Sequence, residues 1–495
     1  MTDVAAPEAT PSLGAKVLGG FAWSIVMVVV LQLCRVVFGI TLARLLTPSQ
    51  YGLAGMALVF SSLVLSFSDL SMGSGLVQRK SISEADRSTV FWTSAGVGLL
   101  LTSAGVALSG PLAAFYHQPR VAPLFAVVSI TFFLISLQVT QASLLQRDMR
   151  FRVLTLRIAV ANVIGGVVSI TLAALGTGPW AIILSQICTT GTSTILLWTY
   201  SSWRPRLAFS LTSLRQLGGF GLNLLGARTA SYLNRNADNL LVGRFLGSTA
   251  LGAYSVAYNI MLLPLGQVII PIQEVLFPAY SRWQDDRKQV AQVYLRVVRV
   301  VAAVVGPAMV GVALISHDFV RVVLGERWLA AAPVLAVLAP VAFVQSLSGL
   351  GDRVLTALDR TRLIRRFTTL ESVLTVPAFA LGLHWGILGV AVCYAAVNTP
   401  LQLVYIWLTL RALGLGVSDF VRSFAGVIEA VLAMSVACLL VHSGLTAANV
   451  DLWQRLGIEV LVSALVFIPL CGFWQPEVVR EVRSLRHIRS AASVA

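Results

Sequence analysis

The chain has 495 residues, of which 57% are hydrophobic and only 12% are charged, and its formal net charge is +15. Soluble globular chains carry roughly 25% charged residues, so this composition excludes that class. The residues instead fall into long apolar stretches of the kind that cross a bilayer as helices of about 20 residues each.

Residues 1–15 lack the charged start, the apolar core and the cleavage site of a signal peptide, and we interpret them as a polar cytoplasmic tail. Fourteen apolar segments follow and predict an all-α polytopic membrane protein. Membrane barrels would instead show alternating segments of about ten residues. The segments lie near residues 18–44, 53–76, 89–115, 121–145, 155–175, 179–200, 217–244, 250–273, 297–324, 330–357, 367–383, 386–410, 420–442 and 454–474.

The positive charges are distributed very unequally between the two predicted sides. Of the 36 Lys and Arg residues, 27 fall in loops and tails on the side of the amino terminus, and six fall on the other side. An excess of Lys and Arg marks the cytoplasmic loops of membrane proteins. We therefore place both termini in the cytoplasm and expect the basic loops to contact anionic lipid.

The charge distribution, together with the placement of the Cys and His residues, excludes several function classes. The cations are spread over many short loops, which does not indicate binding to nucleic acid. The five cysteines lie in apolar segments without CxxC spacing, so we expect them to pack as small hydrophobic residues. The five histidines are scattered, and no Gly-rich phosphate loop precedes a helix. We therefore predict no metal, no cofactor and no soluble catalytic domain.

The chain repeats itself at an offset of about 200 residues. The segment "LGGFAWS" at Leu18 resembles "LGGFGLN" at Leu217, and "ARLLTPSQYGLA" (43–54) resembles "GRFLGSTALGAY" (243–254). Such a repeat predicts two lobes of six helices, related by a pseudo-two-fold axis along the membrane normal, with the substrate site between them. The predicted parts are the tail at 1–15, an N-lobe at 16–206, a C-lobe at 207–412, two further helices at 413–476 and a basic cytoplasmic tail at 477–495.

The motifs "ITLARLLTPSQYGLAGMALVF", "FSDLSMGSGLVQRK", "LLQRDMRFR", "NADNLLVGRFLGSTALGAYSVAYN" and "VLFPAYSR" carry a resemblance over about residues 15–410. They resemble the polysaccharide-transporter branch of the MOP exporter superfamily, and more narrowly the Wzx-type flippases of colanic-acid and teichuronic-acid export. The resemblance implies a bacterial inner-membrane flippase that moves a lipid-linked oligosaccharide, carried on undecaprenyl diphosphate, to the outer leaflet by alternating access. It also implies a possible partnership with a polysaccharide polymerase or export machinery.

Polar residues inside the predicted spans are candidate functional groups, because a charge in the bilayer is costly unless it faces a partner or a wet cavity. On the seventh segment, Arg228 and Arg235 lie seven residues apart and therefore share a helix face, which Asn239 continues. Arg35 is the repeat counterpart of Arg235. Because the arginine guanidinium can form two parallel hydrogen bonds to a phosphate, we expect Arg35, Arg228 and Arg235 to bind the diphosphate. We expect Asn234 and Asn239 to bind sugar hydroxyls.

Two alternatives remain open for these residues. Arg235 and Asp238 are three residues apart and could form an intrahelical ion pair, either permanently or until substrate displaces it. Arg44 and Arg244 lie at the outer mouth, where they either extend to lipid headgroups or contribute to substrate binding.

No ATPase motif is present, so we expect transport to be coupled to H⁺ or Na⁺ through an intramembrane carboxylate. The candidates are Asp238, Asp69 and Glu274. Pro271 is the candidate hinge, because proline removes a backbone hydrogen bond and bends a helix.

Two other functions were weighed. A drug or cation antiporter of the MATE kind would have acidic, aromatic-lined lobes, which the arginines of the first and seventh segments disfavour. A membrane-bound sugar polymerase or ligase would need a sizeable outer loop for catalysis, whereas all predicted outer loops are short.

Overall fold

The structure is a computed structural model that describes residues 31–32, 34–68, 72–79, 81–477 and 480. Among the helical residues, the side chains at 62–68, 72, 74 and 216–235 also lie outside the description. The described chain is helical with no strand, which confirms the predicted fold class.

The described part of the N-lobe includes a helical stretch over residues 34–45. Its further helices are α2 (Pro48–Ser68), α3 (Met72–Gln78), α4 (Glu84–Ala107), α5 (Ser109–Tyr116), α6 (Val121–Val128), α7 (Ile130–Ser136), α8 (Val139–Arg147), α9 (Phe151–Ala174) and α10 (Trp180–Tyr200). The predicted segment at 121–145 is thus built from three consecutive short helices.

The C-lobe begins with the long helix α11 (Leu211–Pro264). It continues with a π-helix η1 (Leu265–Ile269), α12 (Ile270–Arg282), α13 (Arg287–Leu314), α14 (Ser316–Phe319), a second π-helix η2 (Val320–Leu324), a 3₁₀ turn η3 (Glu326–Trp328), α15 (Ala331–Gly349), α16 (Gly351–Ala357), α17 (Thr361–Gly382), the turn η4 (Leu383–Trp385) and α18 (Gly386–Leu413). The last helices are α19 (Val417–Ser423), α20 (Ala425–Ala447) and α21 (Leu452–Trp474).

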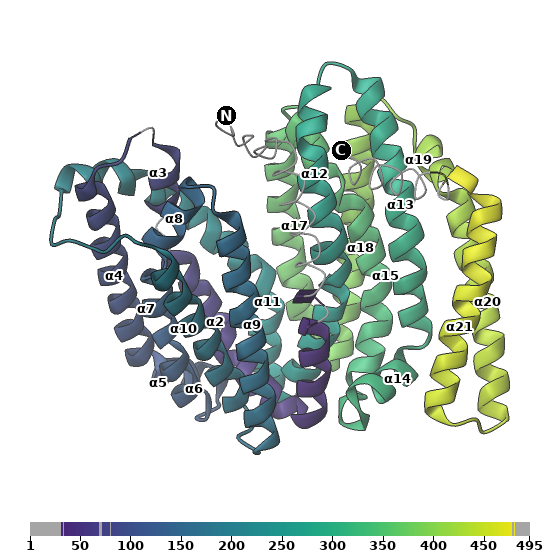
Figure 1. Ribbon diagram of the computed structural model, residues 1–495. Helices are drawn as coiled ribbons and strands as arrows, with labels where there is room; N and C mark the ends of the chain where they lie inside the picture. The colour runs from purple at the N-terminus through teal and green to yellow at the C-terminus, as the bar shows by residue number, and fades with distance from the viewer. Residues whose placement is uncertain (1–30, 33, 69–71, 80, 478–479, 481–495) are drawn as a thin grey trace, which may run out of the picture.

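Figure 1 shows the N-lobe and the C-lobe side by side, with α20 and α21 as a pair on the far side of the C-lobe. The loops predicted to be outside the cell, including those next to α5, α6 and α14, lie at the lower end of this view. We call this the outer end. The ends of α3, α8 and α12 lie at the opposite end, which is predicted to face the cytoplasm and which we call the cytoplasmic end.

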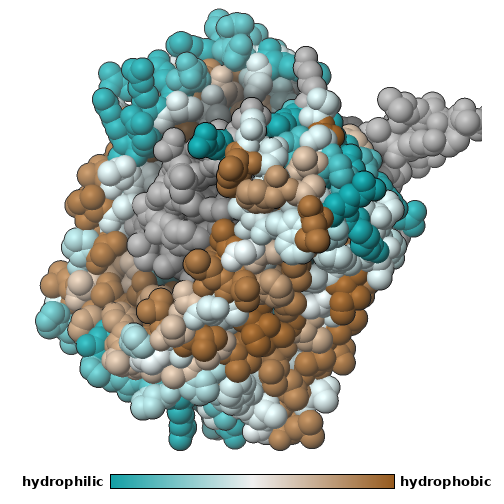
Figure 2. Space-filling view, turned by 90° about the vertical axis from the view of Figure 1, so that its left-hand side faces the viewer, coloured by the Kyte–Doolittle hydropathy of each residue, from teal (hydrophilic) through white to brown (hydrophobic). Residues whose placement is uncertain are grey.

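Ten helical stretches of the described chain are long and apolar enough to cross a membrane. Thr361–Leu413 includes both of the predicted segments at 367–383 and 386–410, and Asn236–Arg282 includes the predicted segment at 250–273 together with the end of the one at 217–244. The total of fourteen spans stays a prediction. Figure 2 shows hydrophobic residues across the middle of one face and hydrophilic residues at its ends, which is the distribution of a membrane-embedded surface.

Local signals explain where several helices begin and bend. Ser83 and Asp86 form a capping box at the start of α4, with the Asp86 amide donating to Ser83 Oγ at 3.1 Å and the Ser83 amide donating to Asp86 Oδ2 at 2.9 Å. α11 is broken at Gly247, whose φ of 85° is a conformation that side chains other than glycine rarely adopt. This break separates the predicted seventh and eighth spans.

The segment that joins the two lobes is fastened to the cytoplasmic end of α4. Trp203 donates from Nε1 to Glu84 at 2.7 Å, and the Ser210 amide donates to Thr89 Oγ1 at 2.9 Å. Ser213 in the first turn of α11 donates to Asp86 Oδ1 at 2.6 Å. The beginning of the C-lobe is therefore anchored on an N-lobe helix.

Candidate functional site

A pocket of about 240 Å³ lies between the lobes, bounded by α2 on one side and by both arms of α11 on the other. Its polar lining comes from the C-lobe: Asn236, Asn239, Ser255 and Asn259. The N-lobe wall is mainly apolar and includes Tyr51 and Leu58. The Oδ1 atom of Asn239 is buried and has no hydrogen-bond partner in the described chain. The pocket thus offers free hydrogen-bonding capacity to a guest.

Of the three arginines predicted to bind the diphosphate, only Arg35 has a described side chain. Arg35 lies on the helical stretch of residues 34–45 and is exposed. Arg228, Asn234 and Arg235 belong to α11, but their side chains lie outside the described residues. Whether these groups meet around a diphosphate stays a prediction.

Asp238 faces the interior of the C-lobe. It is fully buried. Its carboxylate accepts a hydrogen bond from the Tyr254 hydroxyl at 3.1 Å and another from the backbone N–H of Asn239 at 2.7 Å. Tyr254 stacks on Tyr258, and Tyr258 meets Tyr394 edge to face with the ring centres 6.3 Å apart. Asp238 is therefore in direct contact with an aromatic path that leads deeper into the lobe.

That path ends in a network of polar side chains, which we call the C-lobe network: Gln345, Ser348, Glu371, Tyr394, Asn398 and Gln402. Gln345 donates to the Tyr394 hydroxyl at 2.5 Å and to Asn398 at 2.8 Å. Asn398 and Gln402 both donate to Glu371 Oε1, at 3.0 and 2.8 Å. Apart from Glu371, which is partly exposed, the members are buried.

This network was not predicted from the sequence. A signal was available, because Asn398 and Gln402 are four residues apart on one face of an otherwise apolar helix. The other carboxylates predicted to couple transport to an ion lie elsewhere. Glu274 is exposed on α12, and Asp69 lies outside the described residues. Pro271 is exposed at the start of α12, directly after the π-helix η1, which interrupts the regular helix at this point.

The two lobes touch closely at the outer end. Gly52 of α2 lies against the Ser248 carbonyl, and Gly252 of α11 lies against the Pro48 carbonyl, so closely that a Cβ atom on either glycine would overlap that oxygen. Ser49 and Ser248 join the same contact with their hydroxyl oxygens 3.1 Å apart. We call these residues, Pro48, Ser49, Gly52, Ser248 and Gly252, the outer contact.

Arg44 and Arg244 flank the outer contact, and each reaches into the opposite lobe. Arg44 donates to the carbonyls of Val322 and Val323, the latter at 3.0 Å. These carbonyls end the π-helix η2, where backbone acceptors lack helical partners. Arg244 contacts the His117 ring, with Nη1 2.8 Å from Nε2. Lipid headgroups or substrate were the partners expected for these arginines from the sequence, and a bond across the lobes was not predicted.

A second contact fastens the lobes beside Arg44. Trp328 of η3 is fully buried and donates from Nε1 to the Ala43 carbonyl at 2.6 Å. Its ring meets Tyr51 of α2 edge to face at 5.6 Å. Ala43 lies in the last turn of the stretch over residues 34–45, so the indole satisfies a carbonyl that the helix leaves free.

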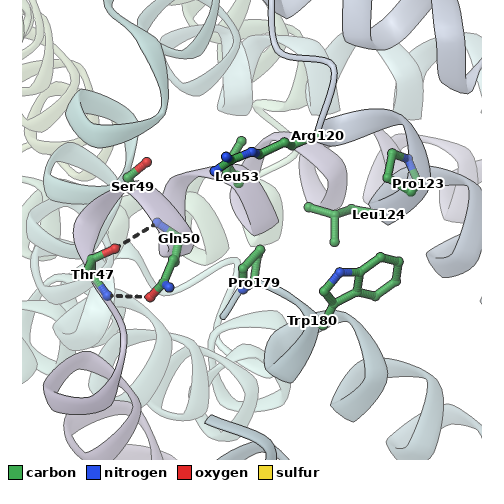
Figure 3. A pocket seen from close by; sticks show the side chains of 9 residues that line it. All are labelled: Thr47, Ser49, Gln50, Leu53, Arg120, Pro123, Leu124, Pro179 and Trp180. Atoms are coloured by element: carbon green, nitrogen blue, oxygen red, sulfur yellow. Dashed lines mark hydrogen bonds between the residues drawn. The ribbon is translucent and has the colours of Figure 1, made fainter. Parts of the chain in front are cut away.

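Another pocket, of about 430 Å³, lies at the outer end of the N-lobe and is lined by Thr47, Ser49, Gln50, Leu53, Arg120, Pro123, Leu124, Pro179 and Trp180. Figure 3 shows Thr47 and Gln50 joined by two hydrogen bonds at the start of α2. These bonds fix the first turn of α2. Ser49 lines this pocket and also contacts Ser248, so the pocket directly adjoins the outer contact.

The family model "Polysaccharide biosynthesis protein" matches residues 41–333, which is more than half of the chain. The chain belongs to the polysaccharide biosynthesis protein family. This confirms the resemblance found in the motifs. Because it has this family's sequence and many apolar helices, the protein is a multi-pass membrane protein of polysaccharide biosynthesis.

Curated relatives match this chain over most of their length. The chain is 29% identical to the lipopolysaccharide biosynthesis protein WzxC of Escherichia coli K12, over 75% of this chain and 76% of WzxC. It is 27% identical to the teichuronic acid biosynthesis protein TuaB of Bacillus subtilis 168, over 92% and 95% of the two chains.

Solved structures show the same fold. The lipid II flippase MurJ in an inward closed conformation matches with a TM-score of 0.74 at 17% identity, over 92% of this chain and all of the MurJ chain. An inward-facing multidrug transporter of the MATE family, from the MOP superfamily, matches with a TM-score of 0.60 at 13% identity, over 78% and 94%. The family member described here therefore has the fold of MurJ and of this MATE transporter.

Proposed function

We propose that this protein is a flippase that moves an oligosaccharide linked to undecaprenyl diphosphate from the cytoplasmic to the outer leaflet of the bacterial inner membrane. The relatives support the substrate class, since WzxC and TuaB are named for lipopolysaccharide and teichuronic acid biosynthesis. The MurJ-like fold is consistent with a lipid substrate.

The observation that carries the proposal is the polar pocket between the lobes. Amides and a hydroxyl from Asn236, Asn239, Ser255 and Asn259 gather there in a protein that is otherwise strongly apolar. A drug-sized apolar guest would leave the buried Asn239 Oδ1 atom without a hydrogen-bond partner, at a cost of about 1–3 kcal/mol. A sugar hydroxyl, which donates as well as accepts hydrogen bonds, would satisfy it. Arg35, Arg228 and Arg235 would then bind the diphosphate.

The outer contact supports alternating access as the mechanism. Its small residues let two helices of different lobes touch through their backbones, and Arg44 and Arg244 bind the same two lobes together on either side. In our proposal these contacts hold the outer mouth closed while substrate enters from the cytoplasm, and they separate to release it. Both termini lie in the cytoplasm in this scheme.

We assign ion coupling to Asp238 and the C-lobe network. A buried carboxylate without a cationic partner in the described chain is a suitable group to take up H⁺ or Na⁺. Tyr254, Tyr258 and Tyr394 contact one another in sequence and connect Asp238 to the network that contains Glu371. Ion binding at Asp238 would therefore affect the packing around Glu371. Binding of the ion at Asp238 would then alter how α11 packs in the C-lobe. Basic cytoplasmic loops contact anionic lipid, and a polysaccharide polymerase is the expected downstream partner.

A complementation experiment tests the function. A strain that lacks its own flippase and supplies the matching repeat unit would carry the wild-type gene or variants Asn239→Ala, Arg35→Ala and Arg235→Ala. We expect the wild type to restore polymer and the variants to accumulate the lipid-linked repeat unit. Asn162→Ala is the control, because Asn162 is a half-buried asparagine in the spanning helix α9 that donates to the Ile158 carbonyl of the same helix, away from the inter-lobe pocket.

The same strains distinguish the proposed flippase from a MATE-like antiporter. If the wild type gave drug resistance and no polymer, the proposed substrate would be wrong. If all three variants, at normal expression, exported polymer as the wild type does, the assignment of the site would be wrong.

A further inference from the structure

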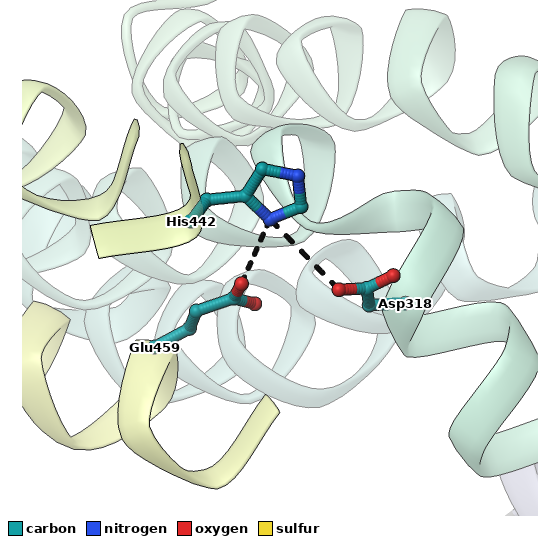
Figure 4. A group of neighbouring side chains, drawn as sticks. All are labelled: Asp318, His442 and Glu459. Atoms are coloured by element: carbon teal, nitrogen blue, oxygen red, sulfur yellow. Dashed lines mark hydrogen bonds and ion pairs between the residues drawn. The ribbon is translucent and has the colours of Figure 1, made fainter. Parts of the chain in front are cut away.

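Three side chains that commonly bind metals meet at the outer end of the C-lobe, although they are far apart in the sequence. Asp318 belongs to α14, His442 to α20 and Glu459 to α21. Their ligand atoms all lie within 4.8 Å of one another. Figure 4 shows the His442 ring facing both carboxylates, with Nδ1 2.8 Å from Glu459 Oε1 and 3.8 Å from Asp318 Oδ2.

The carboxylates of this triad are buried and incompletely satisfied. The side chain of Asp318 is 2% exposed and that of Glu459 is 0% exposed. In the described part of the chain, Asp318 Oδ2 and Glu459 Oε2 have no hydrogen-bond partner. Leaving a buried polar group without a partner is unfavourable, and more so when the group is charged. The triad therefore has two buried acceptor atoms without a partner, which a bound cation would satisfy.

Arg455 stabilises the triad from outside without occupying these atoms. Its Nη2 atom lies 2.5 Å from Asp318 Oδ1, the oxygen that does not face His442. Its Nε atom is 4.0 Å from Glu459 Oε1. Carboxylates that bind metals are commonly held by such an outer hydrogen-bond partner. His317 Nδ1 also lies 3.7 Å from Asp318 Oδ1. With both histidines neutral, one arginine and two carboxylates leave a net negative charge.

We propose that Asp318, His442 and Glu459 form a binding site for one divalent transition-metal cation of the Zn²⁺ type. One imidazole nitrogen and two carboxylate oxygens are ligands that Zn²⁺ accepts, whereas Mg²⁺ and Ca²⁺ prefer oxygen ligands only. Tetrahedral coordination would bring the ligand atoms closer together and leave one position for water. His442 is 39% exposed, so a cation can enter from the outer side.

The triad is continuous with the structure that receives Arg44. α14 leads directly into η2, whose last carbonyls accept the Arg44 hydrogen bonds. Trp453, which lies under the Arg44 guanidinium at 5.3 Å, is two residues before Arg455. A bound metal would join α20 and α21 to α14. It would also make η2, which follows α14 and accepts the Arg44 hydrogen bonds, more rigid. Slower opening of the outer contact is the expected consequence, and that part rests on the proposed function.

Metal titration of the purified full-length protein tests the site directly. The protein would carry no polyhistidine tag, would be stripped with a chelator, and would be titrated calorimetrically with Zn²⁺, Mn²⁺ or Mg²⁺. We expect one equivalent of Zn²⁺ to bind and Mg²⁺ to bind at least tenfold more weakly. His442→Ala and Glu459→Gln should each weaken Zn²⁺ binding at least tenfold. His384→Ala, which removes another exposed histidine of the C-lobe, should bind as the wild type does.

Thermal unfolding provides a second readout that separates binding from folding. Zn²⁺ should raise the midpoint of the wild type and leave that of Glu459→Gln unchanged, while the two proteins elute alike in size-exclusion chromatography. Absence of saturable Zn²⁺ binding to the wild type, or equal affinity in the wild type and both triad variants, would overturn the proposal. These readouts do not depend on transport, so they hold or fail separately from the flippase assignment.

Discussion

Gly52 and Gly252 hold equivalent positions in the two lobes, and each lies against the backbone of the helix that carries the other. Gly52 faces the Ser248 carbonyl, and Gly252 faces the Pro48 carbonyl. A reciprocal contact of this kind is expected when two similar halves meet across a pseudo-two-fold axis. Small residues allow helices in membranes to approach closely, and here they allow it at the outer end of both lobes.

Adding a methyl group at either glycine should open the outer contact. Gly52→Ala and Gly252→Ala would place Cβ in overlap with a backbone carbonyl, which cannot move aside as a flexible side chain can. We expect each variant to lose most of its transport, measured as polymer export, because the outer mouth no longer closes. Gly96→Ala is the control, since its Cβ would meet no atom within 4 Å. Full export by both variants would show that the contact is not needed.

A disulfide across the same contact should stop the transport cycle. The Ser49 and Ser248 hydroxyl oxygens are 3.1 Å apart, so cysteines at both positions can bond after a small adjustment. In a background without the native cysteines, we expect Ser49→Cys/Ser248→Cys to lose transport under oxidation and to regain it with reductant. Each single cysteine variant serves as a control. Undiminished transport with the disulfide formed would contradict the need for separation.

Removing either arginine that crosses the lobes should shift the protein toward an open outer mouth. A hydrogen bond that involves a charged group contributes about 1.5–3 kcal/mol in general, and less at an exposed site. We therefore expect Arg44→Ala and Arg244→Ala to increase thiol labelling of Ser248→Cys severalfold. Arg327→Ala is the matched control, because Arg327 lines the same pocket as Arg44 but makes no hydrogen bond in the described chain. Labelling that equals this control would assign both arginines another role.

Replacing Asp238 should uncouple transport from the ion gradient. Asp238→Asn keeps the size of the side chain and can still accept from Tyr254, but it removes the charge that would attract a cation. In proteoliposomes we expect loss of gradient-driven flipping with retained binding of the lipid-linked substrate. Tyr254→Phe, which removes only the hydroxyl, should have a smaller effect. Gradient-driven flipping by Asp238→Asn at the wild-type rate would exclude this residue from coupling.

The sequence by itself was sufficient for the helical membrane fold, the family and the approximate position of the spans. Hydropathy is a property of contiguous residues, and a span must satisfy its backbone hydrogen bonds within itself, so each helix is determined locally. The sequence also placed the polar stretch around Asp238 and the counterparts Arg44 and Arg244. It could not tell which face of a helix meets which neighbour, and it did not anticipate that Asp238 points into the C-lobe while Asn239 lines the inter-lobe pocket.

The tertiary structure alone decided the contacts between residues that are far apart in the chain. Arg44 meets Val323, Glu371 meets Asn398, and Asp318 meets His442 and Glu459 only because the packing of apolar helices sets their rotation and depth. Packing depends on the shapes of two surfaces at once, and no periodicity within one segment records it. The pattern along the chain therefore determined which segments enter the membrane, and their packing against one another determined which polar groups could act together.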